Sequence, residues 1–168
     1  VQALQEGETK VETFTVKSVD GTETTVTINV VGTNDAPTAR IDTAAMLEEK
    51  PVTFTVLGND TDPDSGDVLT VTGASVDPAM GTVTVNADGS LSFTPAANVN
   101  GPVTVTYTIA DGHGGTSTST ATINITPLPD TAVLGTGAGT VKEDTPAQTS
   151  ASGTLSIVDP DAGEAAFQ

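Results

Sequence analysis

The chain contains no cysteine and no tryptophan, and its 168 residues include only one histidine, one tyrosine and five lysines and arginines. Without cysteine there is no disulfide scaffold, thiol nucleophile or thiolate zinc site. The single histidine leaves few ways to build a histidine-based metal site or a nucleophilic triad. Five basic side chains are too few to neutralise phosphates, so we expect no nucleic-acid partner. No run of about 18 apolar residues occurs, so we expect no direct insertion into a membrane.

Acidic residues are abundant. There are 22 aspartates and glutamates, which give a formal net charge of -17 at pH 7. A surface of this charge stays soluble and attracts divalent cations. Carboxylates are the hard oxygen ligands that calcium prefers. A cysteine-free, acidic and threonine-rich composition suits a secreted protein, and its carboxylates suit divalent cations such as calcium (Ca²⁺).

The remaining composition predicts an all-β fold. Threonine (32 residues) and valine (20) are β-branched and favour strands, and 17 glycines and 10 prolines separate them into short segments. Apolar and polar residues alternate in several runs, as in sheets with one buried face. These runs are residues 13–19, 52–56, 82–85, 91–93, 103–109 and 122–125. Many short strands between turn residues predict a β-sandwich or a barrel.

Local signals refine this prediction. The run Asn86-Ala87-Asp88-Gly89 lies between two strand patterns and predicts a hairpin loop. Residues 43–49 have the length for one helical turn, which Pro51 limits. We expect Tyr107 and the four phenylalanines to belong to the core, and His113 to lie in a solvated turn.

Internal repetition divides the chain into three parts. Residues 14–21 and 104–112 are strands that end in Asp-Gly, and each precedes a second strand, so both are typical of a closing hairpin. Residues 62–67 and 159–164 share the form Asp-Pro-Asp-x-Gly-acid, which we interpret as the opening of a module. We predict the C-terminal part of one module over residues 1–35, a complete module over 36–127 and the start of another over 128–168. We also expect the whole to be a segment of a longer protein.

The candidate metal ligands lie in turns. Asp62 and Asp64 flank a proline, and Asp111 follows the last hairpin strand. Loops gather at the ends of a Greek-key sandwich, so these carboxylates and the linker residues Asn34 and Asp35 are predicted to converge on one end. Calcium takes about six to eight oxygens, which suits this set. The alternative is that these aspartates only form turns.

These motifs resemble those of known repeats. The run Asp62-Pro63-Asp64, the run Asp111-Gly112-His113-Gly114-Gly115 and the run Asn34-Asp35-Ala36-Pro37 resemble motifs of cadherin-type extracellular repeats, and residues 36–127 resemble the bacterial cadherin-like tandem repeats of giant secreted adhesins. The flanks resemble the VCBS repeat through residues 139–145 and 152–164, at its start, and residues 26–37, at its end. Such repeats occur in long bacterial surface proteins of the RTX adhesin type.

The resemblance implies an all-β, immunoglobulin- or cadherin-like Greek-key sandwich with about seven strands in the complete module, and calcium at the module junctions. It assigns ligand roles to Asn34, Asp35, Asp62, Asp64 and Asp111, and it implies that Glu48 or Glu49 serves the following junction. The repeated motif adds Asp159 and Asp161. The second linker, residues 129–132, has Asp130 but lacks the Asn-Asp pair. Glu6 or Glu8 could replace donors that an upstream module would give the first junction.

These observations favour a structural extender, or stalk, of a secreted bacterial adhesin at the outer-membrane surface, stiffened by calcium at its junctions. Its expected partners are neighbouring repeats of the same chain, with weak head-to-tail self-association through the incomplete flanks. The alternatives are a module that binds a carbohydrate or a host protein, and an accessory domain of an extracellular enzyme. We expect no catalytic activity, because a carboxylate pair needs a substrate cleft that a sandwich of about 92 residues rarely offers.

Overall fold

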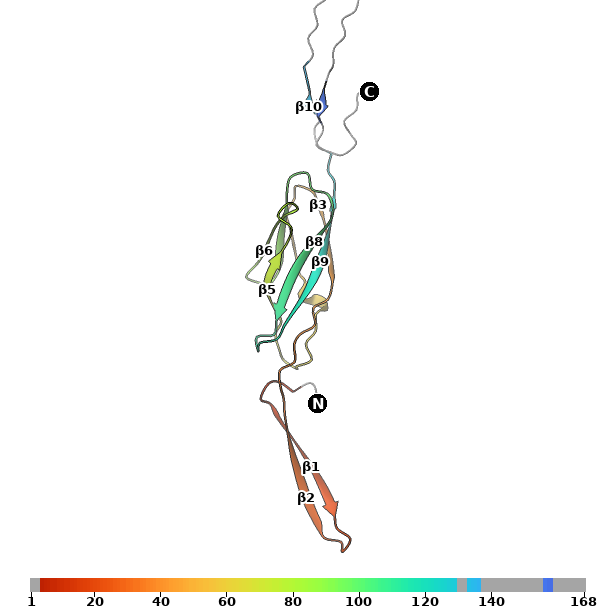
Figure 1. Cartoon of the computed structure of the whole chain (residues 1–168), viewed down its shortest axis with the longest axis vertical. Coiled ribbons are helices and arrows are strands. Elements are labelled where there is room, and N and C mark those ends of the chain that lie inside the picture. The colour runs from red at the N-terminus through yellow and green to blue at the C-terminus, as the bar shows by residue number, and fades with distance from the viewer. Residues whose placement is uncertain (1–3, 130–132, 137–155, 159–168) are drawn as a thin grey trace, which may run out of the picture.

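The computed structural model describes residues 4–129, 133–136 and 156–158, and within these ranges it is all-β apart from one 3-10 turn, η1 (Leu57–Asn59) (Figure 1). The strands are β1 (Thr9–Lys17), β2 (Glu23–Val31), β3 (Asp42–Leu47), β4 (Val52–Phe54), β5 (Thr70–Ser75), β6 (Gly81–Val85), β7 (Leu91–Pro95), β8 (Gly101–Ala110), β9 (Thr116–Thr126), β10 (Val133–Leu134) and β11 (Ile157–Val158). No helix in the described residues is long and apolar enough to cross a membrane.

Strands β3 to β9 form a sandwich of two sheets. One sheet has the order β3-β9-β8-β5 and the other the order β4-β7-β6. Strand β3 runs parallel to β9, and every other pairing within the sandwich is antiparallel. The predicted Greek-key sandwich of about seven strands is therefore confirmed, and so is the hairpin loop that joins β6 to β7. Residues 43–49, a possible helical turn, mostly belong to β3.

The core follows from the alternation in the sequence. Along β8, Val103, Val105, Tyr107 and Ile109 are buried, and Ile123 of β9 lies beside them. The intervening threonines face outward and pair across the two strands, as β-branched residues do on a pleated surface. The other core residues are Met46, Val56, Val71, Leu91, Phe93, Ala121 and Ile125.

Tyr107 anchors the segment that leads into the sandwich. Its hydroxyl group lies 2.5 Å from the carbonyl oxygen of Arg40 and 2.8 Å from Oδ2 of Asp42, and it donates to these acceptors. Burial, followed by the bond to Asp42, raises the pKa of Tyr107. The hydroxyl therefore stays protonated and holds the start of β3 against the sheet.

Strands β1 and β2 form a separate two-stranded hairpin that extends from one end of the sandwich (Figure 1). Its apolar face lies in solvent, and Phe14 is 52% exposed. The prediction that all phenylalanines belong to the core is therefore wrong for Phe14, because no described residue covers this face. Phe93 is buried and Phe54 packs against the core, whereas Phe167 lies outside the described residues.

Candidate metal centre at the linker end of the sandwich

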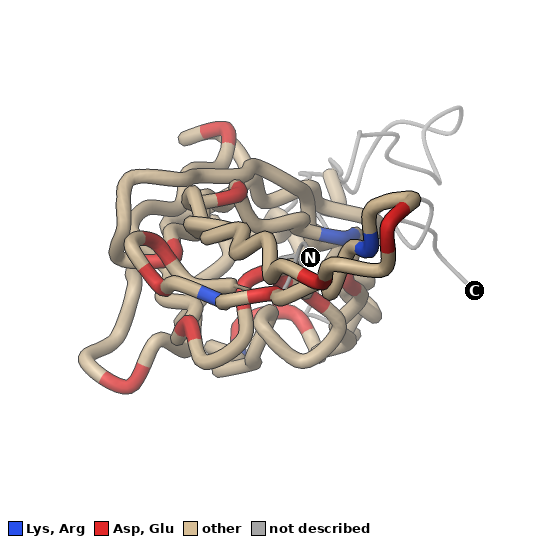
Figure 2. Tube along the Cα trace, turned by 90° about the horizontal axis from the view of Figure 1, so that it is seen from below, with Lys and Arg blue, Asp and Glu red and all other residues tan. Residues whose placement is uncertain are grey.

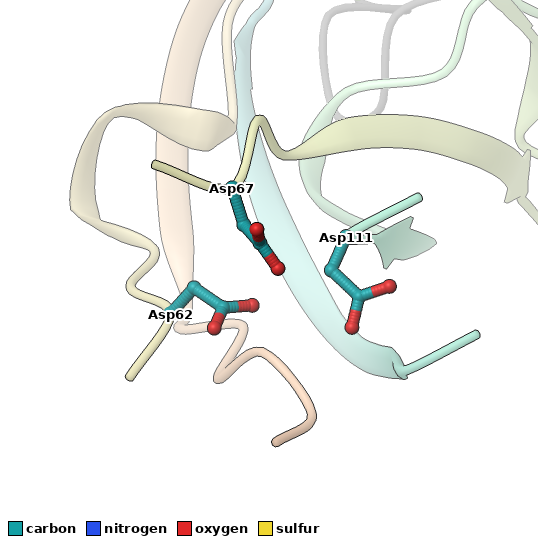
Figure 3. A group of neighbouring side chains, drawn as sticks. All are labelled: Asp62, Asp67 and Asp111. Atoms are coloured by element: carbon teal, nitrogen blue, oxygen red, sulfur yellow. The ribbon is translucent and has the colours of Figure 1, made fainter. Parts of the chain in front are cut away.

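Five predicted ligand positions, including Asp35 in the linker, come together where β2 leads into the sandwich. Asp62 and Asp64 lie in the loop between η1 and β5, Asp111 directly follows β8, and the linker that contains Asn34 passes between them. These segments meet at one end of the sandwich, because β8 ends there at Ala110 and β5 begins there at Thr70. The carboxylates of Asp62 and Asp111 point toward one space, together with that of Asp67 (Figure 3).

The linker is hydrogen-bonded to the acidic loops. Asn34 donates from Nδ2 to Oδ2 of Asp111 at 2.9 Å, and the amide of Asp35 donates to Oδ2 of Asp64 at 2.7 Å. The amide of Asp64 donates in turn to Oδ1 of Asp62 at 2.9 Å. The predicted convergence of all five residues is therefore seen in the structure, and the linker touches two different loops.

The carboxylates leave oxygens free in the middle. One oxygen from each of Asp62, Asp67 and Asp111 lies within 4.8 Å of the others. Asp64 is only 3% exposed. Four buried oxygens at this end have no hydrogen-bond partner among the described residues: Asn34 Oδ1, Asp62 Oδ2, Asp64 Oδ1 and Asp67 Oδ1. Buried polar atoms are normally paired, and a group of unpaired carboxylate and amide oxygens fits a bound cation.

Asp111 is held in its ionised form. The side chain of Asn34 lowers the pKa of Asp111 below its ordinary value of 3.8, and the backbone amides of His113, Gly115 and Gly114 lower it further, against an opposing effect of burial. The amides of His113 and Gly115 donate to Oδ1 at 2.7 and 3.0 Å. This Asp-Gly-x-Gly-Gly turn therefore presents a fixed carboxylate to the centre.

Two residues of this centre were absent from the sequence-based ligand set. The side chain of Asp67 is 1% exposed, and its Oδ2 lies 3.1 Å from Nδ1 of His113. The signal for Asp67 was present, because an acid occupies the sixth position of both Asp-Pro-Asp-x-Gly-acid motifs. His113 lies in a turn with its side chain 47% exposed, but it contacts the site, so it is more than a solvated turn residue.

Asp60 lies two residues before Asp62 in the sequence, but its carboxylate is not part of the Asp62, Asp67 and Asp111 cluster. Its Oδ1 accepts a hydrogen bond from the amide of Arg40 at 2.7 Å, and its charge contributes to the raised pKa of Asp42, which arises mainly from burial. Closeness in sequence therefore does not bring Asp60 into the centre.

Glu48 and Glu49 lie at the opposite end of the sandwich, after β3. The amide of Glu48 donates to the carbonyl oxygen of Thr126 at 3.0 Å, beside the end of β9. Glu48 is 1% exposed, and neither of its carboxylate oxygens has a partner within the described part of the chain. Glu49 is exposed and has a φ of 59°. The other predicted ligands, Asp130, Asp159 and Asp161, lie outside the described residues.

The sequence matches a known protein family. The model of the bacterial cadherin-like domain matches residues 34–127, so the chain belongs to that family. The structure is similar to protocadherin gamma B2 extracellular domains 1–5 (TM-score 0.55, 16% identity) and to protocadherin gamma C5 EC1-3 (TM-score 0.51, 18% identity). These alignments cover 95% and 92% of this chain, which spans 39% and 55% of those chains. No curated protein matches its sequence.

Gly115 provides a test of how closely the linker packs on this centre. A methyl group on Gly115 would lie 2.1 Å from Oδ2 of Asp111 and 2.8 Å from the Cα atom of Ala36, so the turn or the linker would have to move. We expect Gly115→Ala to lower the free energy of unfolding by about 1–3 kcal/mol, measured by urea denaturation. Gly58→Ala is the control, since nothing lies within 4 Å of that position. Equal stability of the two variants would contradict the close packing.

The bond from Asn34 to Asp111 predicts a pH dependence. Because the folded state lowers the pKa of Asp111, its contribution to stability is present above about pH 4 and is lost as pH falls through the lowered value. In EDTA, Asn34→Ala should melt at a lower temperature than the unmodified chain at pH 6, and this difference should shrink below pH 4. Thermal melting at several pH values measures it. A difference that stays constant down to pH 2 would show that the bond does not depend on the charge.

Proposed function

We propose that this chain is an extender segment of a secreted bacterial surface adhesin, in which calcium fixes the β1–β2 hairpin to the sandwich. The observation that carries the proposal is the position of the linker. Asp35 donates a hydrogen bond to Asp64, whose Oδ1 is buried and unpartnered in the described structure. Asn34 donates to Asp111, and its own Oδ1 is likewise buried and unpartnered there. A cation held by those oxygens would bind the linker and both loops at once.

The available donors fit calcium. Asp62, Asp67 and Asp111 each offer a carboxylate oxygen, and Asn34 and Asp64 add the unpaired oxygens Oδ1. All of these are hard oxygen ligands from short side chains on separate loops, which is the flexible, oxygen-rich arrangement that calcium accepts. Water or a second carboxylate oxygen can complete the six to eight ligands that the ion takes.

The mechanism is electrostatic. Without a cation, the three carboxylates repel one another across distances below 4.8 Å, and this repulsion pushes the two loops and the linker apart. A divalent cation removes the repulsion and shares its ligands across the joint. The hairpin is then held by the cation as well as by the contact of the Gln5 side chain with Gly66. Binding would therefore convert a hinge into a stiff connection.

The opposite end of the sandwich supports an extended array. Glu48 is buried there with both carboxylate oxygens unpaired in the described structure, directly beside the strand that leads to the second linker. We propose that Glu48 serves a second cation at the next junction, to which Glu49 and Asp130 could contribute. One sandwich would then carry a cation at each end, and neighbouring repeats of the same chain would be its first partners.

The family and the charge agree with a position outside the cell. The chain belongs to a bacterial cadherin-like family, and domains of this kind act as extracellular adhesion or extender modules. Acidic residues are spread over the molecule and Lys and Arg are few (Figure 2). Extracellular calcium modules bind the ion at roughly 10⁻⁴ to 10⁻³ M, which corresponds to the concentrations found outside cells. The VCBS-like flanks support an RTX-type adhesin as the full protein.

Removing two ligands tests the site. We expect 10 mM calcium to stabilise the unmodified chain by about 2 kcal/mol, or roughly 10 °C in melting temperature. Asp62→Asn with Asp67→Asn should abolish this shift. In EDTA the same variant should melt no lower than the unmodified chain, because two repelling charges are gone. Differential scanning calorimetry measures both quantities.

The matched control is Asp77→Asn with Asp88→Asn, which changes the net charge equally. Asp77 and Asp88 accept hydrogen bonds in turns outside the cluster. This control should keep the full calcium shift. If the double variant at Asp62 and Asp67 also kept it, the proposed site would be wrong. If the unmodified chain showed no shift at 10 mM calcium, the proposed function would be wrong.

A further inference from the structure

The aspartates that the loop between η1 and β5 gives to the metal centre each have one oxygen that is held by a hydrogen bond. The amide of Asp64 donates to Oδ1 of Asp62, and the amide of Asp35 donates to Oδ2 of Asp64. The other oxygens, Asp62 Oδ2 and Asp64 Oδ1, are buried and have no hydrogen-bond partner among the described residues. The hydrogen bonds thus fix which atom of each carboxylate is left for a cation.

Asp67 repeats this arrangement, but a side chain takes the place of the backbone amide. Its Oδ2 lies 3.1 Å from Nδ1 of His113, whereas its Oδ1 is buried and unpartnered in the described structure. The side chain of Asp67 is only 1% exposed, so water has little access to either oxygen. The imidazole of His113 therefore stands where Asp62 and Asp64 have a backbone N–H.

His113 is itself held in place by the turn between β8 and β9. Its backbone amide donates to Oδ1 of Asp111 at 2.7 Å. It lies between Gly112 and Gly114, whose φ angles of 90° and 109° belong to the region that glycine adopts readily. The amide of His113 thus contacts a carboxylate of one loop and its ring contacts a carboxylate of the other. A single residue joins the two loops that supply Asp67 and Asp111.

The ring is the donor in the contact with Asp67. An ionised carboxylate has acceptor oxygens only, so a hydrogen bond across 3.1 Å requires the hydrogen on Nδ1. A nitrogen that carries this hydrogen cannot also bind a metal, and calcium prefers oxygen ligands to nitrogen. His113 is also not part of the group of ligand atoms that lie within 4.8 Å of one another. It therefore acts on a cation through Asp67 and not as a ligand.

We infer that His113 is a positioning residue of the metal centre, which holds Oδ2 of Asp67 so that Asp67 binds the cation through Oδ1 alone. This inference rests on the proposed calcium site and deepens it, because it assigns one ligand atom to each aspartate of the loop. These atoms are Asp62 Oδ2, Asp64 Oδ1 and Asp67 Oδ1. Partners that hold a ligating group from outside typically change the metal affinity by about 10- to 100-fold when they are removed.

The physical reason for such a loss is the freedom that Asp67 would gain. Without the ring N–H, the described structure offers no hydrogen-bond partner to either of its oxygens, and the link between the loop and the β8–β9 turn is gone. The carboxylate can then rotate about its side-chain torsions. Binding a cation would have to fix these torsions again, and this ordering opposes binding.

Two substitutions of nearly the same shape separate the ring N–H from the bulk of the side chain. In His113→Asn the amide nitrogen takes the position of Nδ1 and can donate to Asp67, whereas His113→Leu has a methyl group there. Calorimetric melting at increasing calcium and constant ionic strength gives the concentration needed for a set rise above each variant's own melting temperature in EDTA. His113→Leu should need about tenfold more calcium than the unmodified chain, and His113→Asn should need nearly the same.

The single histidine of the chain gives a second readout that needs no variant. Nitrogen-15 NMR of the unmodified protein at pH 8 shows which ring nitrogen carries the hydrogen, and every imidazole signal belongs to His113. We expect the hydrogen on Nδ1 in 10 mM calcium. A ring that only fills space in the turn would have no reason to select this tautomer, so the measurement separates positioning from packing.

The outcomes separate this inference from the proposed function. If the unmodified chain shows no calcium shift, the proposed function fails. If the shift is present but His113→Leu needs no more calcium than the unmodified chain, or if Nδ1 carries no hydrogen, this inference alone is wrong. A His113→Leu variant that only melts lower in EDTA would show a structural role. A His113→Asn variant as weak as His113→Leu would also overturn the inference, because the N–H would not be the feature that matters.

Discussion

The proposed role depends on the repulsion between carboxylates at the joint between the hairpin and the sandwich. Asp62, Asp67 and Asp111 place oxygens within 4.8 Å of one another, and the linker crosses this space hydrogen-bonded to two of the surrounding loops. A folded domain gains nothing from such a cluster by itself, because like charges in a buried setting destabilise one another. A cation shared by the loops and the linker would remove this repulsion. The proposed stiffening of the joint rests on that effect.

The sandwich supplies the rigidity that this role needs. Its core side chains are buried between two sheets, and Tyr107 fastens the segment after the linker to the start of β3. The strands therefore deliver Asp111 and the loop before β5 to one end in a fixed relation, while β3 delivers Glu48 to the other end. In the proposed role, the separation of the two acidic sites by the full length of the sandwich would allow one module to connect two neighbours.

Much of this could be predicted from the sequence, because strand alternation and turn residues are local signals. Alternation in β8 and β9 marks both as strands with one buried face, and the meeting of Asp62, Asp64 and Asp111 follows from where loops lie in a Greek key. Alternation assigns Phe14 to an apolar face, but it cannot tell whether anything covers that face. Closeness in sequence also cannot tell which acids share a site, since Asp60 accepts a hydrogen bond from the Arg40 amide while Asp67 joins the cluster. These outcomes depend on tertiary contacts that no local pattern contains.

Measuring how freely the hairpin moves against the sandwich tests the central claim most directly. The chain has no native cysteine, so spin labels on Thr25→Cys in β2 and Thr106→Cys in β8, both exposed positions, would be the only labels present. Double electron–electron resonance on dilute protein gives the distribution of the distance between them. The account predicts a narrow distribution in millimolar calcium and a broad one in EDTA. The labelled chain that also carries Asp62→Asn with Asp67→Asn should give a broad distribution in both conditions. Distributions of equal width with and without calcium would contradict it.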